Sequence, residues 1–132
     1  MTRQAYRFCL IAATLLLFLA GAFDGLTETL LHHYPAFSNL LPNADPYWWN
    51  PELSWPNKGD NFLTRTLLVW TTDAYHFTRF AARVLLAAGV GAFAITSPLP
   101  FSRVWWQWAV VFGSGMLVAW LIGFYLVWAL VF

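Results

Sequence analysis

Residues 104–132, VWWQWAVVFGSGMLVAWLIGFYLVWALVF, contain no charged side chain. An α-helix rises about 1.5 Å per residue, so roughly 20 apolar residues cross about 30 Å of hydrocarbon. This run is therefore long enough to span a membrane. Three tryptophans near its start, Trp105, Trp106 and Trp108, form an aromatic belt that is typical of the membrane–water interface.

Two more uncharged runs lie at 8–23 and 84–102. The second has the length of a membrane span, whereas the first reaches it only if its helix continues past Asp24. The sequence thus predicts an all-α integral membrane protein with about three transmembrane helices in a single membrane domain, 1–132. The predicted elements are helices over 5–33, 61–97 and 103–132, with an aromatic interfacial loop over 34–60 between the first two.

The composition supports the same class. Of the 132 residues, 60% are hydrophobic, 20% are aromatic and only 10% are charged, whereas a soluble domain carries about 25% charged residues. This excludes a disordered chain, a nucleic-acid binder that relies on phosphate contacts, and an ordinary cytosolic enzyme. We expect membrane lipids as partners, together with a second copy of the chain or a partner membrane subunit, and no nucleic acid.

The basic residues suggest a topology. Arg3 and Arg7 precede the first helix, and Arg103 follows the second, so all three lie on one side of the membrane. The positive-inside rule places that side in the cytoplasm and loop 34–60 on the extracytoplasmic side. A bacterial inner membrane is the expected location. The first run also fits a secretory signal with a small-residue cleavage site at 20–22. We interpret it as an uncleaved spanning helix.

The loop over 34–60 is rich in prolines and aromatics. Trp48, Trp49 and Trp55 lie among its turn-forming prolines. Loops of this length are usually functional or disordered, and so many bulky aromatics argue for an ordered cap in the headgroup layer. The three tryptophans have two interpretations: they stack on a sugar ring or a choline headgroup, or they only anchor the loop at the interface.

Polar side chains recur at helical spacing on the first two helices. Asp24, Glu28 and His32 are four residues apart and therefore share one face. The second helix carries a matching polar face, which consists of Thr72, Asp73, His76, Arg79 and Arg83. If the two helices run antiparallel, Asp24 lies at the depth of Arg83.

Two interpretations of these polar faces remain open. In the first, Asp24, Glu28, Arg79 and Arg83 form an interhelical ion-pair ladder in a non-catalytic accessory or structural subunit. In the second, carboxylate–histidine pairs one turn apart bind zinc or iron at the outer membrane interface, and the metal assists a reaction on a lipid or headgroup. A proton relay is a further alternative.

The metal interpretation assigns roles to individual residues. The predicted ligands are Glu28, His32, His33, Asp73 and His76, of which Glu28 and His76 are also the candidate catalytic residues. Asp24, Arg79 and Arg83 would form ion pairs or hold a lipid phosphate. The arginines count against a metal, because they compete for the carboxylates and repel a cation.

Small residues recur on the second and third helices. Those at 87–92 and at 113–115 suit the close approach of two helix backbones. Because three helices bury little surface, we expect these patches to serve as contacts, including contacts between chains.

One part of the sequence resembles a family of small bacterial integral membrane proteins. The residues that carry this resemblance are Glu28-x-x-x-His32-His33-Tyr34-x-x-Phe37, Pro42, Trp49-Asn50-Pro51-Glu52-x-Ser54-Trp55-x-Asn57-Lys58 and Thr72-Asp73-Ala74-Tyr75-His76. They cover roughly residues 28–76. The resemblance implies a membrane location but no activity, cofactor or site residue.

Overall fold

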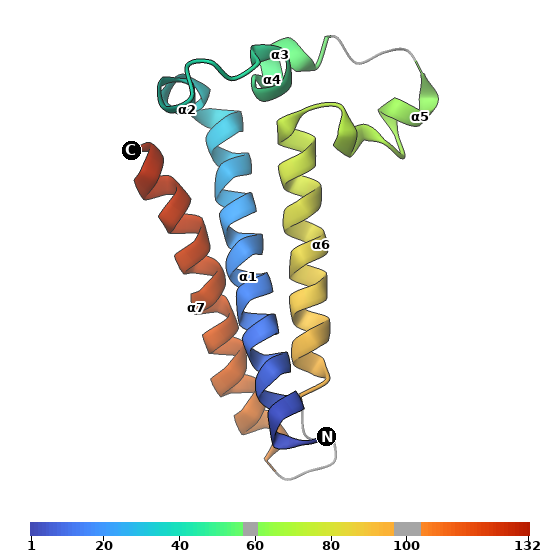
Figure 1. Cartoon of the computed structure of the whole chain (residues 1–132), viewed down its shortest axis with the longest axis vertical. Coiled ribbons are helices and arrows are strands. Elements are labelled where there is room, and N and C mark those ends of the chain that lie inside the picture. The colour runs from blue at the N-terminus through green and yellow to red at the C-terminus, as the bar shows by residue number, and fades with distance from the viewer. Residues whose placement is uncertain (57–60, 97–103) are drawn as a thin grey trace.

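The computed structural model describes residues 1–56, 61–96 and 104–132, and these residues form helices without a strand (Figure 1). The elements are α1 (Arg3–His32), α2 (Tyr34–Leu40), α3 (Pro46–Trp49), α4 (Pro51–Ser54), α5 (Phe62–Arg65), the 3₁₀ helix η1 (Val69–Thr71), α6 (Ala74–Ala94) and α7 (Trp105–Val131). Helices α1, α6 and α7 are long and apolar enough to span a membrane. The all-helical fold and the three candidate spanning helices are therefore as predicted.

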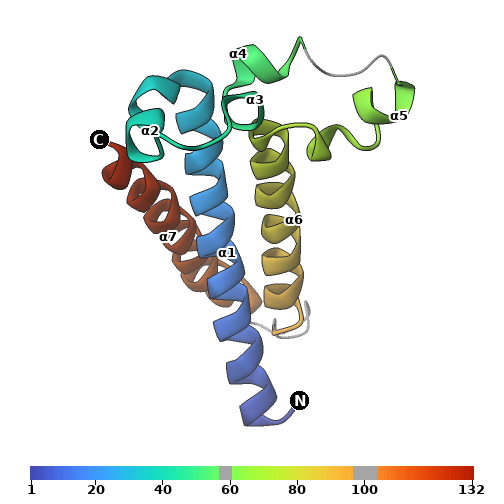
Figure 2. The same ribbon diagram turned by 45° about the horizontal axis from the view of Figure 1, so that its top comes forward.

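Helix α1 is the central helix of the bundle. It packs against α6 along one side and against α7 along the other (Figures 1 and 2). Helix α6 runs antiparallel to α1, whereas α7 runs parallel to it. Helices α2, α3 and α4 cover the C-terminal end of α1, and we call this region (34–56) the cap.

Glycines bring α1 and α7 together. A Cβ atom at Gly21 would collide with the carbonyl oxygen of Trp120, and one at Gly123 would collide with that of Phe18. At Gly25 the added atom would lie 2.7 Å from the Phe124 carbonyl oxygen. The two helices therefore pack backbone against backbone, as small residues allow in membranes. We call Gly21, Gly25 and Gly123 the glycine seam.

Contacts between α1 and α6 are made by side chains, unlike the backbone contacts between α1 and α7. Near the cap, the hydroxyl of Thr27 donates a hydrogen bond to that of Thr78 over 2.8 Å, with only 4% and 2% of these residues exposed. Further along, Leu17 packs over Gly89. Each hydroxyl also lies within hydrogen-bond distance of a backbone carbonyl of its own helix, Thr27 of Phe23 and Thr78 of Tyr75. The bond between the two threonines is the one that joins the helices, and it favours this register of α1 against α6.

Helices α6 and α7 meet at the end of the bundle remote from the cap. There the ring of Phe93 stacks on that of Trp108 with 4.4 Å between centroids, and Phe112 packs beside them. Toward the cap, α7 leans away from α6 (Figure 1). The two helices thus leave part of the surface of α1 uncovered.

The predicted small-residue contacts are found in part. Gly89, in the patch 87–92, lies against Leu17 of α1, whereas an added Cβ would meet nothing within 4 Å at Gly91, Gly113 or Gly115. Among the described residues, the other close approaches use the glycine seam. Contact between chains through 87–92 and 113–115 stays a prediction.

The predicted helix over 61–97 is divided in the structure. Its first part contains only α5 and η1, and the long helix α6 begins at Ala74. Asp73 causes this boundary: its backbone is extended, and its side chain accepts a hydrogen bond from the backbone N–H of His76 over 2.8 Å. A carboxylate in this position caps the new helix. The predicted turn over 97–103, with Arg103, lies outside the described residues.

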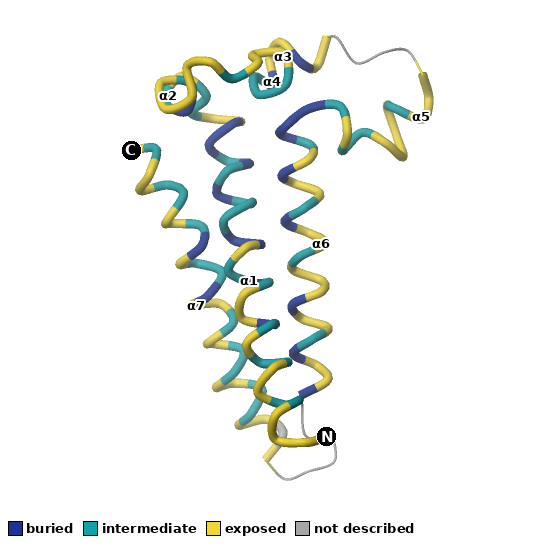
Figure 3. Tube along the Cα trace, viewed as in Figure 1, coloured by how far each residue is buried: buried dark blue, intermediate teal, exposed yellow. Residues whose placement is uncertain are grey.

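The cap is made of short helices, where the sequence suggested only a loop. Each begins with a proline in its first turn, and Asp45 and Asn50 cap α3 and α4. The cap rests on the bundle through a buried cluster of Leu30, Phe37 and Ala74, against which Trp48 and Trp49 pack. Figure 3 shows buried residues at the ends of α1 and α6 that meet the cap.

Candidate functional site

The carboxylate of Asp73 is fully buried and its oxygens are occupied by its own helix. Its two oxygens lie 2.9 and 3.0 Å from Nδ1 of His76, and one of them also accepts the backbone N–H of that residue. The hydroxyl of Thr72 donates to the other oxygen over 3.2 Å. Asp73 therefore holds the imidazole of His76 in a fixed orientation and caps α6 at the same time.

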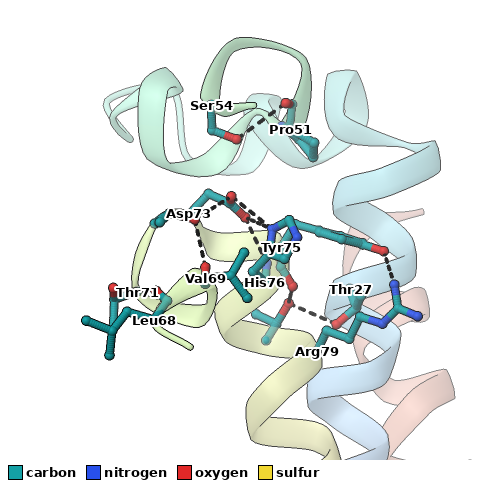
Figure 4. Close-up of polar contacts among 12 residues, drawn as sticks. Thr27, Pro51, Ser54, Leu68, Val69, Thr71, Asp73, Tyr75, His76 and Arg79 are labelled. Atoms are coloured by element: carbon teal, nitrogen blue, oxygen red, sulfur yellow. Dashed lines mark hydrogen bonds and ion pairs between the residues drawn. The ribbon is translucent and has the colours of Figure 1, made fainter. Parts of the chain in front are cut away.

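One turn further along α6, Arg79 reaches Tyr75. Its guanidinium donates a hydrogen bond of 2.6 Å to the Tyr75 hydroxyl and lies over the same ring (Figure 4). Tyr75 itself is buried between the helices and the cap. Figure 4 shows the guanidinium beside Thr27, so Arg79 extends from α6 toward α1.

On α1, Glu28 and His32 form a pair. Glu28 Oε2 lies 3.5 Å from His32 Nε2, one turn along the same helix, and both side chains are exposed. The ring of the neighbouring His33 packs edge-to-face against Trp128 of α7 and against Phe132. Its centroid lies 6.4 Å from that of His32, so His33 contacts both the C-terminal aromatic residues and its neighbour.

The described residues contain no group of three or more His, Cys, Asp or Glu side chains that could hold a metal ion. The predicted ligands instead form the Glu28–His32 pair, with His33 beside His32, and the Asp73–His76 pair. Sequence spacing predicted that the two pairs face each other, but the described residues do not combine them into one group. Zinc or iron at these residues has no support from this arrangement.

The predicted ion-pair ladder is not formed among the described residues either. Asp24 lies within electrostatic range of Glu28, Arg79 and Arg83. Yet no ion pair between described residues joins Asp24 or Glu28 to either arginine, and the pairs that do occur lie within one helix. The side chains of Arg79 and Arg83 are thus exposed and form no ion pair with either acid.

Asp24 lines a groove on the surface of α1 between α6 and α7. The groove has a volume of about 360 Å³. Apart from the one carboxylate, its lining is apolar and comes from all three helices: Leu17, Leu86, Val90, Met116, Leu117 and Trp120. We call it the Asp24 groove.

Charged residues continue the Asp24 groove toward the cap. Glu28 follows Asp24 by four residues on α1, and Arg83 and Arg79 precede Leu86 by three and seven residues on α6. Residues with these spacings share a helix face. Asp24 is therefore the charged residue of the groove lining itself, and Glu28, Arg79 and Arg83 follow toward the cap on the helix faces that line the groove.

A second cavity lies under the cap, between the end of α1 and helices α2 and α4. It has a volume of about 500 Å³. Its polar and aromatic lining comprises His32, Tyr34, Asn50, Glu52 and Trp55. We call it the cap pocket.

The three predicted stacking tryptophans have different surroundings. Trp55 lines the cap pocket and is 49% exposed. Trp49 packs on Phe37, with 5.2 Å between ring centroids, and Trp48 joins the same cluster. Trp55 is thus the tryptophan available to a ligand in this pocket, while the other two hold the cap on the bundle.

Three residues of this region have roles that the sequence-based prediction missed. Tyr34 and Glu52 line the cap pocket, and Thr27 provides the hydrogen bond that joins α1 to α6. Thr27 follows Asp24 by three residues and so lies near its face, which was the available signal for the hydrogen bond. The pocket residues come from separate short helices, so no spacing pattern connects them.

No family model matches this chain, and no curated protein or solved structure matches it either.

Proposed function

We propose that this protein binds a membrane phospholipid at the extracytoplasmic face of a bacterial inner membrane. The observation that carries the proposal is the Asp24 groove, whose lining is apolar apart from Asp24. Arg79 and Arg83 precede the lining residue Leu86 on the same face of α6, toward the cap. A phospholipid has the same division, with acyl chains in the hydrocarbon and a charged headgroup above them.

The arginines supply the contact with the phosphate. A guanidinium presents several N–H donors in a plane and pairs well with phosphate oxygens. Arg79 is oriented by its hydrogen bond to Tyr75, which reduces the freedom it would lose on binding. Arg83 lies one turn further along the same face.

Asp24 adds a reason for a specific ligand rather than bulk lipid. An ionisable side chain in a spanning helix is costly and usually serves a functional site or a polar partner. Asp24 lines a groove whose other lining residues are apolar. Its carboxylate forms no ion pair with the nearby arginines among the described residues. A headgroup held at this depth gives the carboxylate a polar neighbour.

The two other predicted functions have weaker support. Metal-assisted chemistry lacks an assembled ligand group among the described residues, and an accessory subunit built on an ion-pair ladder lacks the pairs between its helices. Phospholipid binding uses the arginines and acids in the arrangement that they have.

Binding to purified protein tests the proposal. We would titrate the detergent-solubilised protein with a phospholipid and with diacylglycerol of the same acyl chains, and count bound lipids by native mass spectrometry. The phospholipid is expected to bind more tightly. The double variant Arg79→Gln/Arg83→Gln should lose at least tenfold in phospholipid affinity, because each charged hydrogen bond contributes about 1.5–3 kcal/mol.

The chain offers a matched control for this variant. Arg3 and Arg7 have the same spacing at the other end of α1, so Arg3→Gln/Arg7→Gln removes the same charge without touching the groove. Equal losses in the two double variants would contradict a site at Arg79 and Arg83. So would equal binding of the phospholipid and diacylglycerol.

A further inference from the structure

The cap pocket has the size and position of a ligand site. At about 500 Å³ it falls within the range of small-molecule pockets, roughly 300–1,000 Å³. Its walls come from the end of α1, the start of α2 and helix α4.

The lining of the cap pocket suits a cation. Glu52 contributes an exposed carboxylate, and the Glu28 carboxylate lies beside the lining residue His32. Lysine and arginine are absent from the described residues of the lining. An anionic ligand would therefore meet no basic partner from these residues, whereas a positive group would be attracted.

The aromatic rings narrow the class of cation. Trp55 is held by the rings of Tyr75 and His76, with centroids at 6.0 and 6.2 Å, yet 49% of the residue stays exposed. Tyr34 lines the same cavity. Aromatic faces combined with a carboxylate recognise quaternary ammonium groups through cation–π and charge attraction.

The cap pocket and the Asp24 groove are linked along one face of α1. Leu17, Asp24, Glu28 and His32 succeed one another by seven, four and four residues, so they form one stripe from the groove to the pocket. The Thr27–Thr78 hydrogen bond sets Arg79, the next residue of α6, close to the level of Thr27. His32 is five residues beyond Thr27, about 7.5 Å along the helix axis.

We infer that the cap pocket receives the quaternary ammonium group of a choline phospholipid whose phosphate lies at Arg79 and Arg83. This inference rests on the proposed function and specifies its headgroup. The phosphate and ammonium of one headgroup are a few bonds apart, which matches the short separation between the level of Arg79 and the pocket. The pocket thus selects for a zwitterionic lipid over an anionic one.

A comparison of two lipids with the same acyl chains tests this inference. We would measure the affinity of the detergent-solubilised protein for phosphatidylcholine and for phosphatidylglycerol by native mass spectrometry. Phosphatidylcholine should bind about fivefold more tightly, as expected of a cation–π site at a partly exposed pocket. Equal affinities would overturn the inference but leave the proposed function intact, while binding of neither lipid would contradict the proposed function itself.

Variants of the pocket give a second test. Glu52→Gln should weaken phosphatidylcholine about fivefold and leave phosphatidylglycerol unchanged. The control is Asp45→Asn, which removes a carboxylate from the same cap but keeps the helix cap of α3, because asparagine caps as well as aspartate. An unchanged preference in Glu52→Gln would contradict the inference.

Trp55→Leu tests the aromatic contribution, with the exposed Trp106→Leu on α7 as its control. Only the first should reduce the preference for phosphatidylcholine. A final arm separates lipid from free amine: tetramethylammonium should compete with phosphatidylcholine but not with phosphatidylglycerol. Binding of tetramethylammonium without any binding of phosphatidylcholine would assign the pocket to soluble amines and overturn the lipid assignment.

Discussion

Two sides of α1 show two ways to cover a helix in a membrane. On the side of α7, the glycine seam removes side chains, and backbone meets backbone at Gly21 and Gly123. On the face between α6 and α7, the helices diverge and leave the Asp24 groove, about 360 Å³ in volume. The seam stabilises the fold, whereas the groove holds the Asp24 carboxylate, which forms no ion pair with another described residue. Stability and binding are therefore carried by different faces of one helix.

The largest expected effect comes from filling the seam. Gly123→Leu places a side chain against the carbonyl of Phe18, so α1 and α7 must separate along much of their length. Overpacking of this kind costs about 3 kcal/mol or prevents folding. Thermal unfolding in detergent measures it.

Gly115→Leu is the matched control for the seam, since an added Cβ there meets nothing within 4 Å. Its unfolding temperature should stay near that of the native protein. If the two leucine variants were equally stable, the close contact of α1 with α7 would be refuted.

The second-largest expected effect is a gain in stability. Asp24→Leu removes a charge from the apolar groove and should stabilise the bundle by about 1–2 kcal/mol, because a carboxylate within a spanning helix is unfavourable. The same variant should bind phospholipid more weakly. Chemical unfolding and native mass spectrometry on one preparation give both values, with Asp24→Asn separating charge from size.

A destabilised Asp24→Leu variant would mean that the carboxylate serves the fold. The Asp24 groove would then contribute to stability as the glycine seam does, and the proposed division between a structural and a binding face of α1 would be refuted. A more stable variant with undiminished lipid binding would remove Asp24 from the site but leave the arginines in it.

The smallest expected effect concerns the hydrogen bond between Thr27 and Thr78. Thr27→Val should destabilise the bundle by about 0.6 kcal/mol, the typical strength of such a bond between membrane helices. Thr14→Val is the control, because Thr14 bonds only to the Leu10 carbonyl of its own helix in the described structure. A double-mutant cycle with Thr78→Val measures the coupling, and a coupling of zero would show that this bond does not set the register.

The number and class of the spanning helices could be predicted from the sequence. Charges are excluded from 8–23, 84–102 and 104–132, and hydrocarbon admits only segments whose backbone bonds are satisfied internally. The pairing of helices could not be predicted. All seven glycines of the described residues could allow close contact, but only those that face a neighbouring helix are used. Which glycines face a neighbour depends on how the helices cross.

Sequence spacing predicted which residues belong to the candidate site better than it predicted how these residues are arranged. Spacing placed Asp24, Arg79 and Arg83 at one end of the helix pair, and the structure agrees that they lie within electrostatic range. Spacing could not reveal that Asp73 serves as a helix cap, because capping depends on where α6 starts. That start in turn depends on the packing of the cap, to which residues distant in sequence contribute.

Photo-crosslinking shows whether a phospholipid occupies the Asp24 groove. A phospholipid with a diazirine in its acyl chain would be bound to the protein in detergent, irradiated, and its attachment sites mapped by peptide mass spectrometry. We expect labelling at the groove residues Leu17, Leu86 and Trp120, and at least tenfold less labelling in Arg79→Gln/Arg83→Gln. Labelling spread evenly over the exposed faces of α6 and α7, and equal in the variant, would contradict it.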